Sequence, residues 1–209
     1  MLKIKNTIIK SLLSFILLLL STYTVFSQQL VQRDIFEVCY STKKQQPLWL
    51  TYEVECQGGG FSRKGLNFKK DREFVGTTSD NADYYKNVWD KGHLAPAADF
   101  NCSYDKLRAT FSYLNCALQH EKLNRGPWKN LEKYERKLSA QHKVEVKVVL
   151  EFADNLLATG ALVPTYFVKI LSYNNRVEVY RFPNDASVWR KPYKDYQLQD
   201  YLVVEGCVE

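Results

Sequence analysis

One stretch of ten residues organises the chain, and it reads Asp90-Lys91-Gly92-His93-Leu94-Ala95-Pro96-Ala97-Ala98-Asp99. His93, one of only three histidines, stands between a glycine and an apolar run that ends in proline. This context disfavours a helix and predicts a strand end that turns into a loop. Because the unperturbed pKa of histidine lies near neutrality, a histidine held at such an edge can act as a general base. A lone histidine is more often a surface residue beside a turn, so the interpretation depends on the residues downstream of it.

A second set of polar and aromatic residues comes later in the chain in a fixed order, namely Asn115, Gln119, Asn124, Trp128, Glu132 and Arg136. The last four are each four residues apart, and on a helix such residues lie along one face. Gly126-Pro127 suits the start of a helix over 129–141, with Trp128, Leu131 and Leu138 as its apolar stripe. The spacing predicts a row of carboxamide, carboxylate and guanidinium against the strand that carries His93. The alternative is an ordinary surface ion pair between Glu132 and Arg136, which is worth little.

Asp-Lys-Gly-His and this ordered set together resemble the DNA/RNA non-specific endonuclease family, whose active site is a ββα-metal finger. In that family an Asp-Arg-Gly-His motif is followed by Asn-x-x-x-Gln, an Asn five residues after the Gln, and then Trp and Glu. The order and spacing match here. The resemblance runs from about Phe36 onward, and its specific motifs lie between Asp90 and Arg136. It implies an α+β fold with a central, mostly antiparallel sheet flanked by helices.

The resemblance also implies roles for the residues of the site. His93 would take a proton from the attacking water, and Asn124 would bind Mg²⁺, or Mn²⁺ in its place, through its side-chain oxygen. Glu132 would orient water at the metal or position Arg136. Arg63 and Arg136 would hold phosphate oxygens and complete the catalytic set.

Other assignments are less constrained. Arg72 competes with Arg63, because the spacing in this basic cluster is loose. Lys91, which stands where the family has arginine, keeps the charge but loses the planar fork. Lys91, Asn115 and Gln119 are expected to bind substrate, the last two by orienting the site or the substrate backbone. Lys169 is expected to be structural or a remote phosphate contact.

Residues 1–27 are predicted to be a secretory signal peptide. Lys3, Lys5 and Lys10 form a positive region, residues 12–20 are apolar except for Ser14, and small residues stand before the expected cleavage point. The apolar run is shorter than the roughly 20 residues that a membrane anchor needs. We therefore expect an exported protein, secreted or periplasmic, with one domain over 28–209 and no stable membrane association after cleavage.

Net charge and cysteine content constrain the choice of partner and the disulfide pairing less than the motifs constrain the active site. The chain has 29 basic and 23 acidic residues, and loss of three lysines with the leader leaves a formal charge of +3. This balance allows a nucleic-acid partner without requiring one. Five cysteines leave at least one without a partner in the chain, and disulfides and buried thiols are both compatible with the sequence.

Alternation of apolar and polar residues predicts strands over 34–41, 48–54, 144–152, 166–171 and 177–182, and a short apolar run predicts one over 111–114. The last two of the alternating strands flank a hairpin turn at Tyr173-Asn174-Asn175-Arg176.

The predicted function is metal-dependent, non-specific hydrolysis of DNA and/or RNA, recognised through the phosphate backbone, and the resemblance implies 5′-phosphate products. One alternative is a nucleic-acid-binding protein of the same fold with lost or weak catalysis, which would need none of His93, Asn124 and Glu132. An exported adhesion module would show repeats or a paired cysteine framework, and a phosphodiesterase for small nucleotides or a sugar phosphate would share the site. Substrate preference and oligomeric state stay open.

Overall fold

The computed structural model describes residues 27–202 and residue 207. The predicted signal peptide, apart from Ser27, lies outside the described residues. In the described part of the chain, no helix is both long and apolar enough to cross a membrane.

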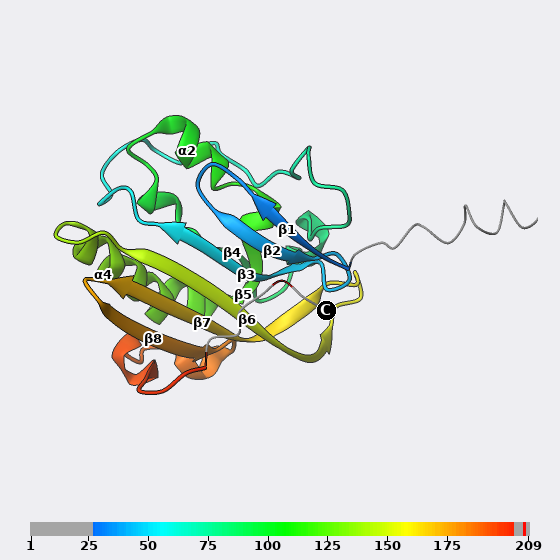
Figure 1. Cartoon of the computed structure of the whole chain (residues 1–209). Coiled ribbons are helices and arrows are strands. Elements are labelled where there is room, and N and C mark those ends of the chain that lie inside the picture. The colour runs from blue at the N-terminus through cyan, green and yellow to red at the C-terminus, as the bar shows by residue number, and fades with distance from the viewer. Residues whose placement is uncertain (1–26, 203–206, 208–209) are drawn as a thin grey trace, which may run out of the picture.

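The main element is a twisted sheet whose paired neighbours all run antiparallel (Figure 1). Its seven strands lie in the order β1-β2-β3-β6-β7-β8-β9. Their bounds are β1 (Gln28–Gln32), β2 (Glu37–Ser41), β3 (Gln46–Glu53), β6 (Glu145–Leu156), β7 (Leu162–Tyr173), β8 (Arg176–Pro183) and β9 (Gln197–Leu198).

A second, two-stranded sheet carries the histidine motif. It pairs β4 (Trp89–His93) with β5 (Cys116–His120), and the chain then continues into α3 (Glu121–Leu123), the irregular turn η4 (Asn124–Trp128) and α4 (Lys129–Ser139). The helix α2 (Tyr104–Ala109) lies in the connection between the two strands. Short 3-10 turns complete the chain at η1 (Asn81–Tyr84), η2 (Ala97–Asp99), η3 (Tyr113–Asn115), η5 (Ala186–Val188) and η6 (Tyr193–Tyr196).

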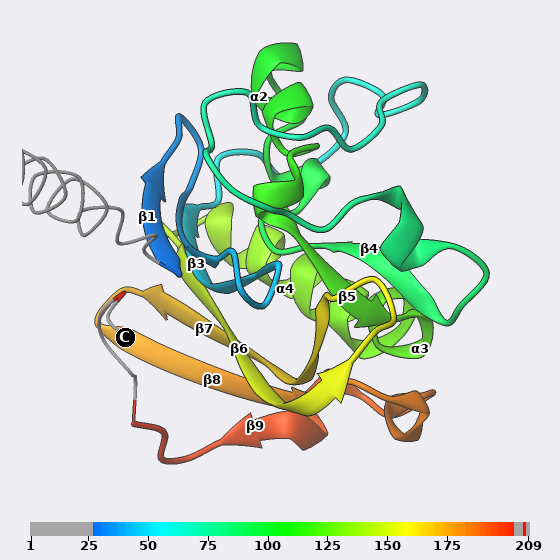
Figure 2. The same cartoon turned by 90° about the vertical axis from the view of Figure 1, so that its right-hand side faces the viewer.

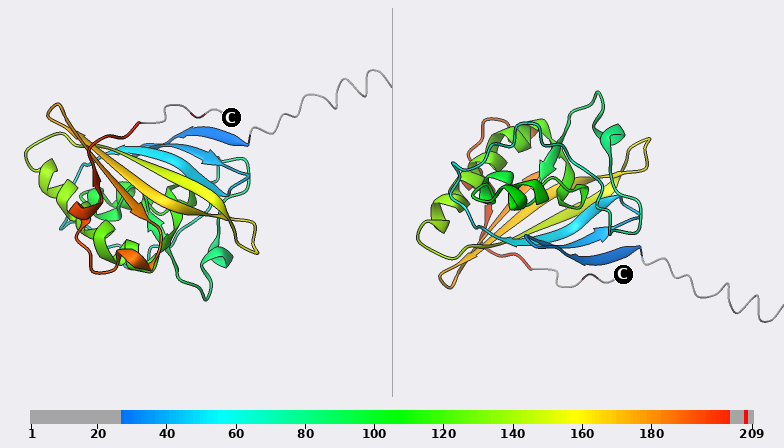
Figure 3. Two further views of the ribbon diagram at one scale, coloured as in Figure 1. Left: turned by 90° about the horizontal axis from the view of Figure 1, so that it is seen from below. Right: turned by 90° about the horizontal axis from the view of Figure 1, so that it is seen from above.

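The ββα unit packs on one face of the large sheet (Figures 2 and 3). Alternate residues of β6, Val146, Val148 and Leu150, are buried in the core cluster, as expected for a strand with one face inward. From the helical side, Trp128 meets Phe167 edge-to-face with ring centroids 5.5 Å apart. This packing fixes α4, and with it the side chains on its opposite face. The α+β architecture predicted from the sequence is confirmed.

Two local predictions are wrong. Residues 111–114 do not form a strand; a 3-10 turn occupies 113–115 and the strand begins at Cys116. The Ser112 hydroxyl accepts a bond from the amide of Leu114 at 3.2 Å, which favours the turn. The predicted continuous helical row from Asn124 to Arg136 is also interrupted, because Gly126 has non-helical φ −106° and ψ −119°. A residue before proline is pushed out of the helical region, and here that proline is Pro127.

The two strands that flank the predicted hairpin turn are confirmed as β7 and β8, and both are longer than predicted. The turn residues Asn174 and Asn175 have φ of 45° and 59°. This left-handed pair is the conformation that a two-residue hairpin turn requires and that asparagine tolerates.

Four of the five cysteines form disulfides. Cys39 is bonded to Cys207, and Cys56 is bonded to Cys102. Cys116 is free and buried. The second disulfide ties the segment after β3 to the segment before α2, at the edge of the cleft that opens beside the ββα unit.

Candidate active site

This cleft has a volume of about 660 Å³. Its polar and charged lining comes from the loop after β3, the strand β4, the segment between η2 and α2, and the consecutive elements η4 and α4. The lining includes Arg63, Asp90, Lys91, His93, Asn101, Asn124, Arg125, Lys129, Glu132 and Arg136. The predicted catalytic and metal-binding residues therefore meet in one place, although Gly126 breaks the helical row between them.

His93 ends β4 and packs against two aromatic rings, Phe68 and Phe111, whose own centroids lie 5.3 Å apart. The imidazole lies 4.6 Å from the ring centroid of Phe68 and 4.9 Å from that of Phe111. Its Nε2 atom is buried and has no hydrogen-bond partner among the described residues. Burial, with the positive charge of Arg63, lowers the pKa of His93 from 6.5 to about 3. The imidazole is therefore neutral at physiological pH, which is the form that can accept a proton.

Asn124 is oriented by the first residue of the motif. Its amide nitrogen donates to Oδ2 of Asp90 at 2.8 Å. Arg125 holds the same carboxylate from the other side, at 2.9 Å from Nε and 2.6 Å from Nη2. Because the amide nitrogen is used in this way, the carbonyl oxygen of Asn124 is the atom left to face a cation.

The donor set fits a hard cation. An amide oxygen at Asn124 and a carboxyl at Glu132 line the same cleft, and Mg²⁺ prefers oxygen ligands and keeps most of its own waters. Within the described residues, no group of three or more His, Cys, Asp or Glu side chains is placed to hold a metal ion. A cation held by these residues would therefore complete its shell with water and substrate phosphate.

Glu132 lies in the first turn of α4, half-buried in the cleft. Burial raises its pKa to about 7; Lys169 and Arg136 oppose the shift, and the neighbouring Glu135 adds to it. The carboxyl therefore gains or loses its proton close to neutral pH, so small changes in its surroundings decide whether it is charged.

Arg136 reaches the cleft from one turn further along α4. Its Nη1 donates to Oδ1 of Asp99 at 2.6 Å, and Asp99 has no solvent exposure. The backbone carbonyl of Asp99 in turn accepts bonds from the amides of Glu55 and Cys56, at 3.2 and 2.8 Å. Asp99 is therefore fixed by the backbone and holds the guanidinium over the cleft.

Lys169 is fully buried under α4. Its ammonium donates to Glu135 at 2.9 Å and to the hydroxyl of Tyr52 at 3.1 Å, and it lies 4.5 Å from the ring centroid of Trp128. Of its two expected roles, the structure supports the structural one and corrects the remote phosphate contact, because no part of the side chain reaches solvent.

Asn115 is a structural residue of the turn after His93. Its side chain accepts from the amide of Ala95 at 2.7 Å and donates to the carbonyls of Ala95 and Thr110, both at 2.9 Å. It has no solvent exposure and does not line the cleft. Of the two roles expected for Asn115, the structure favours orienting the site over contact with the substrate backbone, since its three bonds shape the backbone that follows His93.

Gln119 is likewise fully buried and outside the cleft lining, so the structure favours the same supporting role for it. It packs against Gly92, where a Cβ atom would lie only 2.6 Å from that of Gln119. This contact explains why the residue before His93 must be glycine.

Lys91 lines the cleft but is already engaged. Its ammonium donates to Oδ1 of Asn81 and lies 5.7 and 5.6 Å from the ring centroids of Tyr84 and Tyr113. These contacts tie the motif to the loop that contains η1.

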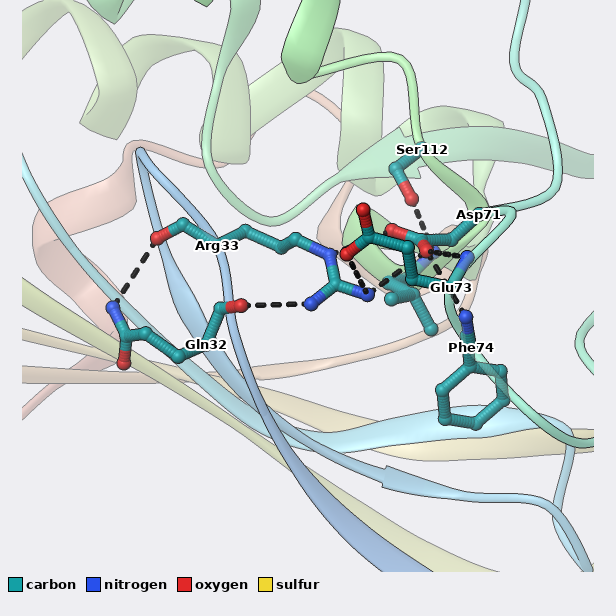
Figure 4. A network of polar contacts seen from close by, with 7 residues as sticks. Gln32, Arg33, Asp71, Glu73, Phe74 and Ser112 are labelled. Atoms are coloured by element: carbon teal, nitrogen blue, oxygen red, sulfur yellow. Dashed lines mark hydrogen bonds and ion pairs between the residues drawn. The ribbon is translucent and has the colours of Figure 1, made fainter.

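The two competing arginines of the basic loop after β3 differ in position. Both are exposed, but Arg63 lines the cleft and Arg72 does not. The loop is anchored by Arg33, which binds Asp71 through two bonds of 2.8 and 2.9 Å (Figure 4). Asp71 also accepts from the amides of Glu73 and Phe74. The structure thus favours Arg63, which shares the cleft with His93 and whose charge helps to lower the pKa of that histidine.

Several residues of the site were not identified from the sequence, namely Asp90, Asp99, Phe68, Phe111 and Lys129. Asp90 lies within the motif itself, and its position next to Asn124 depends on the pairing of β4 with β5. The other four carry no local signal, because their roles arise only from contacts between distant segments.

Comparison with known proteins gives the family. The model of the DNA/RNA non-specific endonuclease family matches residues 20–205 of this chain. The chain belongs to the DNA/RNA non-specific endonuclease family, as the order and spacing of its motifs had indicated.

Curated relatives agree with this assignment. The mitochondrial endonuclease G of Homo sapiens is 31% identical over 160 residues, which cover 68% of this chain and 54% of the relative. The mitochondrial nuclease of Saccharomyces cerevisiae is 32% identical over 128 residues, covering 57% of this chain and 38% of the relative. The chain thus spans about half the length of the first of these relatives and less of the second.

A solved structure shares the fold. A chain from the crystal structure of an EndoG/EndoGI complex matches with a TM-score of 0.71 at 22% identity, covering 81% of this chain and 79% of that one. At this identity the likeness shows the fold alone.

Proposed function

We propose that this protein is a metal-dependent endonuclease that hydrolyses phosphodiester bonds of DNA and/or RNA without sequence specificity. One observation carries the proposal: a neutral, partner-free His93, an oriented Asn124, Glu132 and two arginines converge in a single cleft. Family membership supports the same reaction.

The first requirement of the reaction is a base for the attacking water. The water oxygen forms a bond to phosphorus, its proton passes to the His93 imidazole, and the bond from phosphorus to the 3′ oxygen breaks, so that the 3′ oxygen leaves as an alkoxide and takes a proton from water. Arg63 lowers the basicity of His93 in the free protein. A phosphate bound at Arg63 would offset that positive charge, so substrate binding itself would raise the pKa of His93 and improve it as a base.

The second requirement is stabilisation of the charge that develops on phosphate. Arg63 and Arg136 both line the cleft, and guanidinium groups match phosphate oxygens with paired hydrogen bonds. Asp99 holds Arg136 in place from behind. A divalent cation at Asn124 would supply further charge neutralisation on the phosphate and on the leaving oxygen. Glu132 would orient water on the cleft side of α4 or steady Arg136.

The cleft offers contacts to the backbone of a nucleic acid and not to the edges of particular bases, which supports low sequence specificity. We also propose that the protein is exported through a leader over residues 1–27 and acts as one domain on extracellular or periplasmic nucleic acid. The charge pattern and apolar run at the start of the sequence support this proposal.

The test is digestion of plasmid DNA and of RNA by the purified protein with Mg²⁺, with Mn²⁺ and with EDTA. Metal-dependent degradation of polymers, with slow turnover of a small phosphodiester, supports the proposal. Binding without cleavage under every divalent metal would instead favour a nucleic-acid-binding protein with lost catalysis.

A further inference from the structure

Two exposed aromatic residues at the rim of the cleft have no role in the proposed reaction. Phe61 is 52% exposed and Tyr104 is 48% exposed. Their ring centroids lie 5.9 Å apart with an interplanar angle of 67°, which is an edge-to-face contact. Phe61 lines the cleft, and neither ring belongs to a hydrophobic core cluster of the described residues.

The loop that carries Phe61 is fastened and not free. The amide of Phe61 donates to the carbonyl of Asn101 at 2.6 Å. At Gly60 the loop approaches the backbone of Asn101 so closely that a Cβ atom would lie 2.0 Å from the same carbonyl oxygen, so glycine is required there. The disulfide between Cys56 and Cys102 links the start of this loop to the segment before α2. The backbone thus holds an apolar ring in solvent, next to the ring of Tyr104.

Phe61 lies close in sequence to Arg63, the residue proposed to bind a substrate phosphate. It stands two residues before Arg63, so their Cα atoms are at most about 7 Å apart. A phosphate held by Arg63 would bring its attached nucleoside within reach of the Phe61 ring. Aromatic side chains beside a basic groove stack on the faces of nucleic-acid bases, and any base can bind in this way.

We propose that Phe61, supported by Tyr104, is a stacking platform for one unstacked base next to the cleaved phosphate, so that single-stranded nucleic acid is the preferred substrate. The inference rests on the proposed nuclease function and specifies its substrate class. A duplex hides the faces of its bases between neighbouring pairs, so only a single-stranded or unpaired nucleotide can present a face to the ring.

Insertion of the Phe61 ring into a duplex, instead of stacking on an unpaired base, predicts a different dependence of cleavage on Phe61. An apolar side chain can also enter the minor groove as a wedge and unstack a duplex step. In that arrangement duplex cleavage, and not single-strand cleavage, would depend most on Phe61. Cleavage rates on the two kinds of substrate therefore separate the two geometries.

The experiment compares kcat/KM for a single-stranded oligonucleotide and for its duplex, using wild type, Phe61→Ala, Phe61→Leu and Phe61→Trp. Tyr85→Ala is the matched control, because Tyr85 is 68% exposed and lies outside the cleft lining. We expect Phe61→Ala to lose about tenfold on the single strand, equivalent to about 1.4 kcal/mol, and less than about threefold on the duplex. Phe61→Trp should retain wild-type preference, Phe61→Leu should resemble Phe61→Ala, and the control should change neither rate.

A binding readout keeps this inference separate from the catalytic proposal. In the His93→Ala protein, a single strand containing 2-aminopurine should change its fluorescence on binding, and the change should be lost when Phe61→Ala is added. Equal effects of Phe61→Ala on both substrates, or a larger effect on the duplex, would overturn the stacking platform. If wild type cuts neither substrate, the proposed function fails, while the fluorescence result still decides whether a base stacks on Phe61.

Discussion

Removal of the Asp90 carboxylate should raise the concentration of Mg²⁺ that the protein needs. Asp90 accepts the amide hydrogen of Asn124 at 2.8 Å and so keeps the carbonyl oxygen turned toward the cation. Without that bond the amide can rotate and present its nitrogen, which repels a cation. A hydrogen bond to a charged group contributes about 1.5–3 kcal/mol, and the loss of a residue that orients a metal ligand typically weakens metal affinity or activity by about 10–100-fold.

We therefore expect Asp90→Ala to raise the half-saturating Mg²⁺ concentration for cleavage by about 10-fold or more. The assay is initial rate of plasmid cleavage against Mg²⁺ concentration, at saturating substrate. Glu121→Ala is the matched control, because Glu121 pairs with the same Arg125 at 3.3 Å without bonding to Asn124. If Asp90→Ala leaves the Mg²⁺ requirement unchanged, or if Glu121→Ala raises it equally, the orientation of Asn124 by Asp90 is not what sets metal affinity.

The charged groups around α4 give three further predictions. Glu132 has a pKa raised to about 7 by burial, and its carboxylate is the form that can orient water, so cleavage should increase as pH rises through about 7. Glu132→Gln should remove that limb of the pH profile, and persistence of the limb would assign it to another group. Asp99→Asn should reduce kcat about tenfold with little change in KM, because an amide holds the Arg136 guanidinium less strongly than the carboxyl that accepts its bond at 2.6 Å; a loss confined to KM would contradict this role. Lys169→Met leaves Glu135 as an unpaired buried charge and should lower the free energy of unfolding by about 3–5 kcal/mol, measured by urea denaturation, and an unchanged midpoint would refute it.

The sequence predicts most of the architecture because its signals are local. Alternating apolar residues give the strands of the large sheet, and the two asparagines at 174 and 175 give the hairpin turn between β7 and β8. Of the residues in the motif, His93, Asn124, Glu132 and Arg136 gather in the cleft as predicted, since they lie on β4, η4 and α4 of one ββα unit.

The features that the sequence does not predict depend on contacts between distant segments. Gly126 breaks the helical row, yet packing of Trp128 on the sheet still aligns α4 with Asn124. The burial of Asn115 and Gln119 cannot be read from their spacing, because it depends on how tightly β4 and β5 lie against the core. Nor does any local pattern show that Asp99 holds Arg136, since 37 residues separate them.

The proposed role of His93 as the base in a metal-dependent phosphodiester cleavage can be tested with a single plasmid assay. Plasmid degradation is followed with Mg²⁺ and with EDTA for wild type, His93→Ala and His142→Ala, the last a histidine outside the cleft lining that packs near Tyr173. We predict that wild type and His142→Ala degrade the plasmid with Mg²⁺ only, and that His93→Ala loses at least about 100-fold in rate. Degradation that persists in EDTA, or at wild-type rate in His93→Ala, would contradict the account.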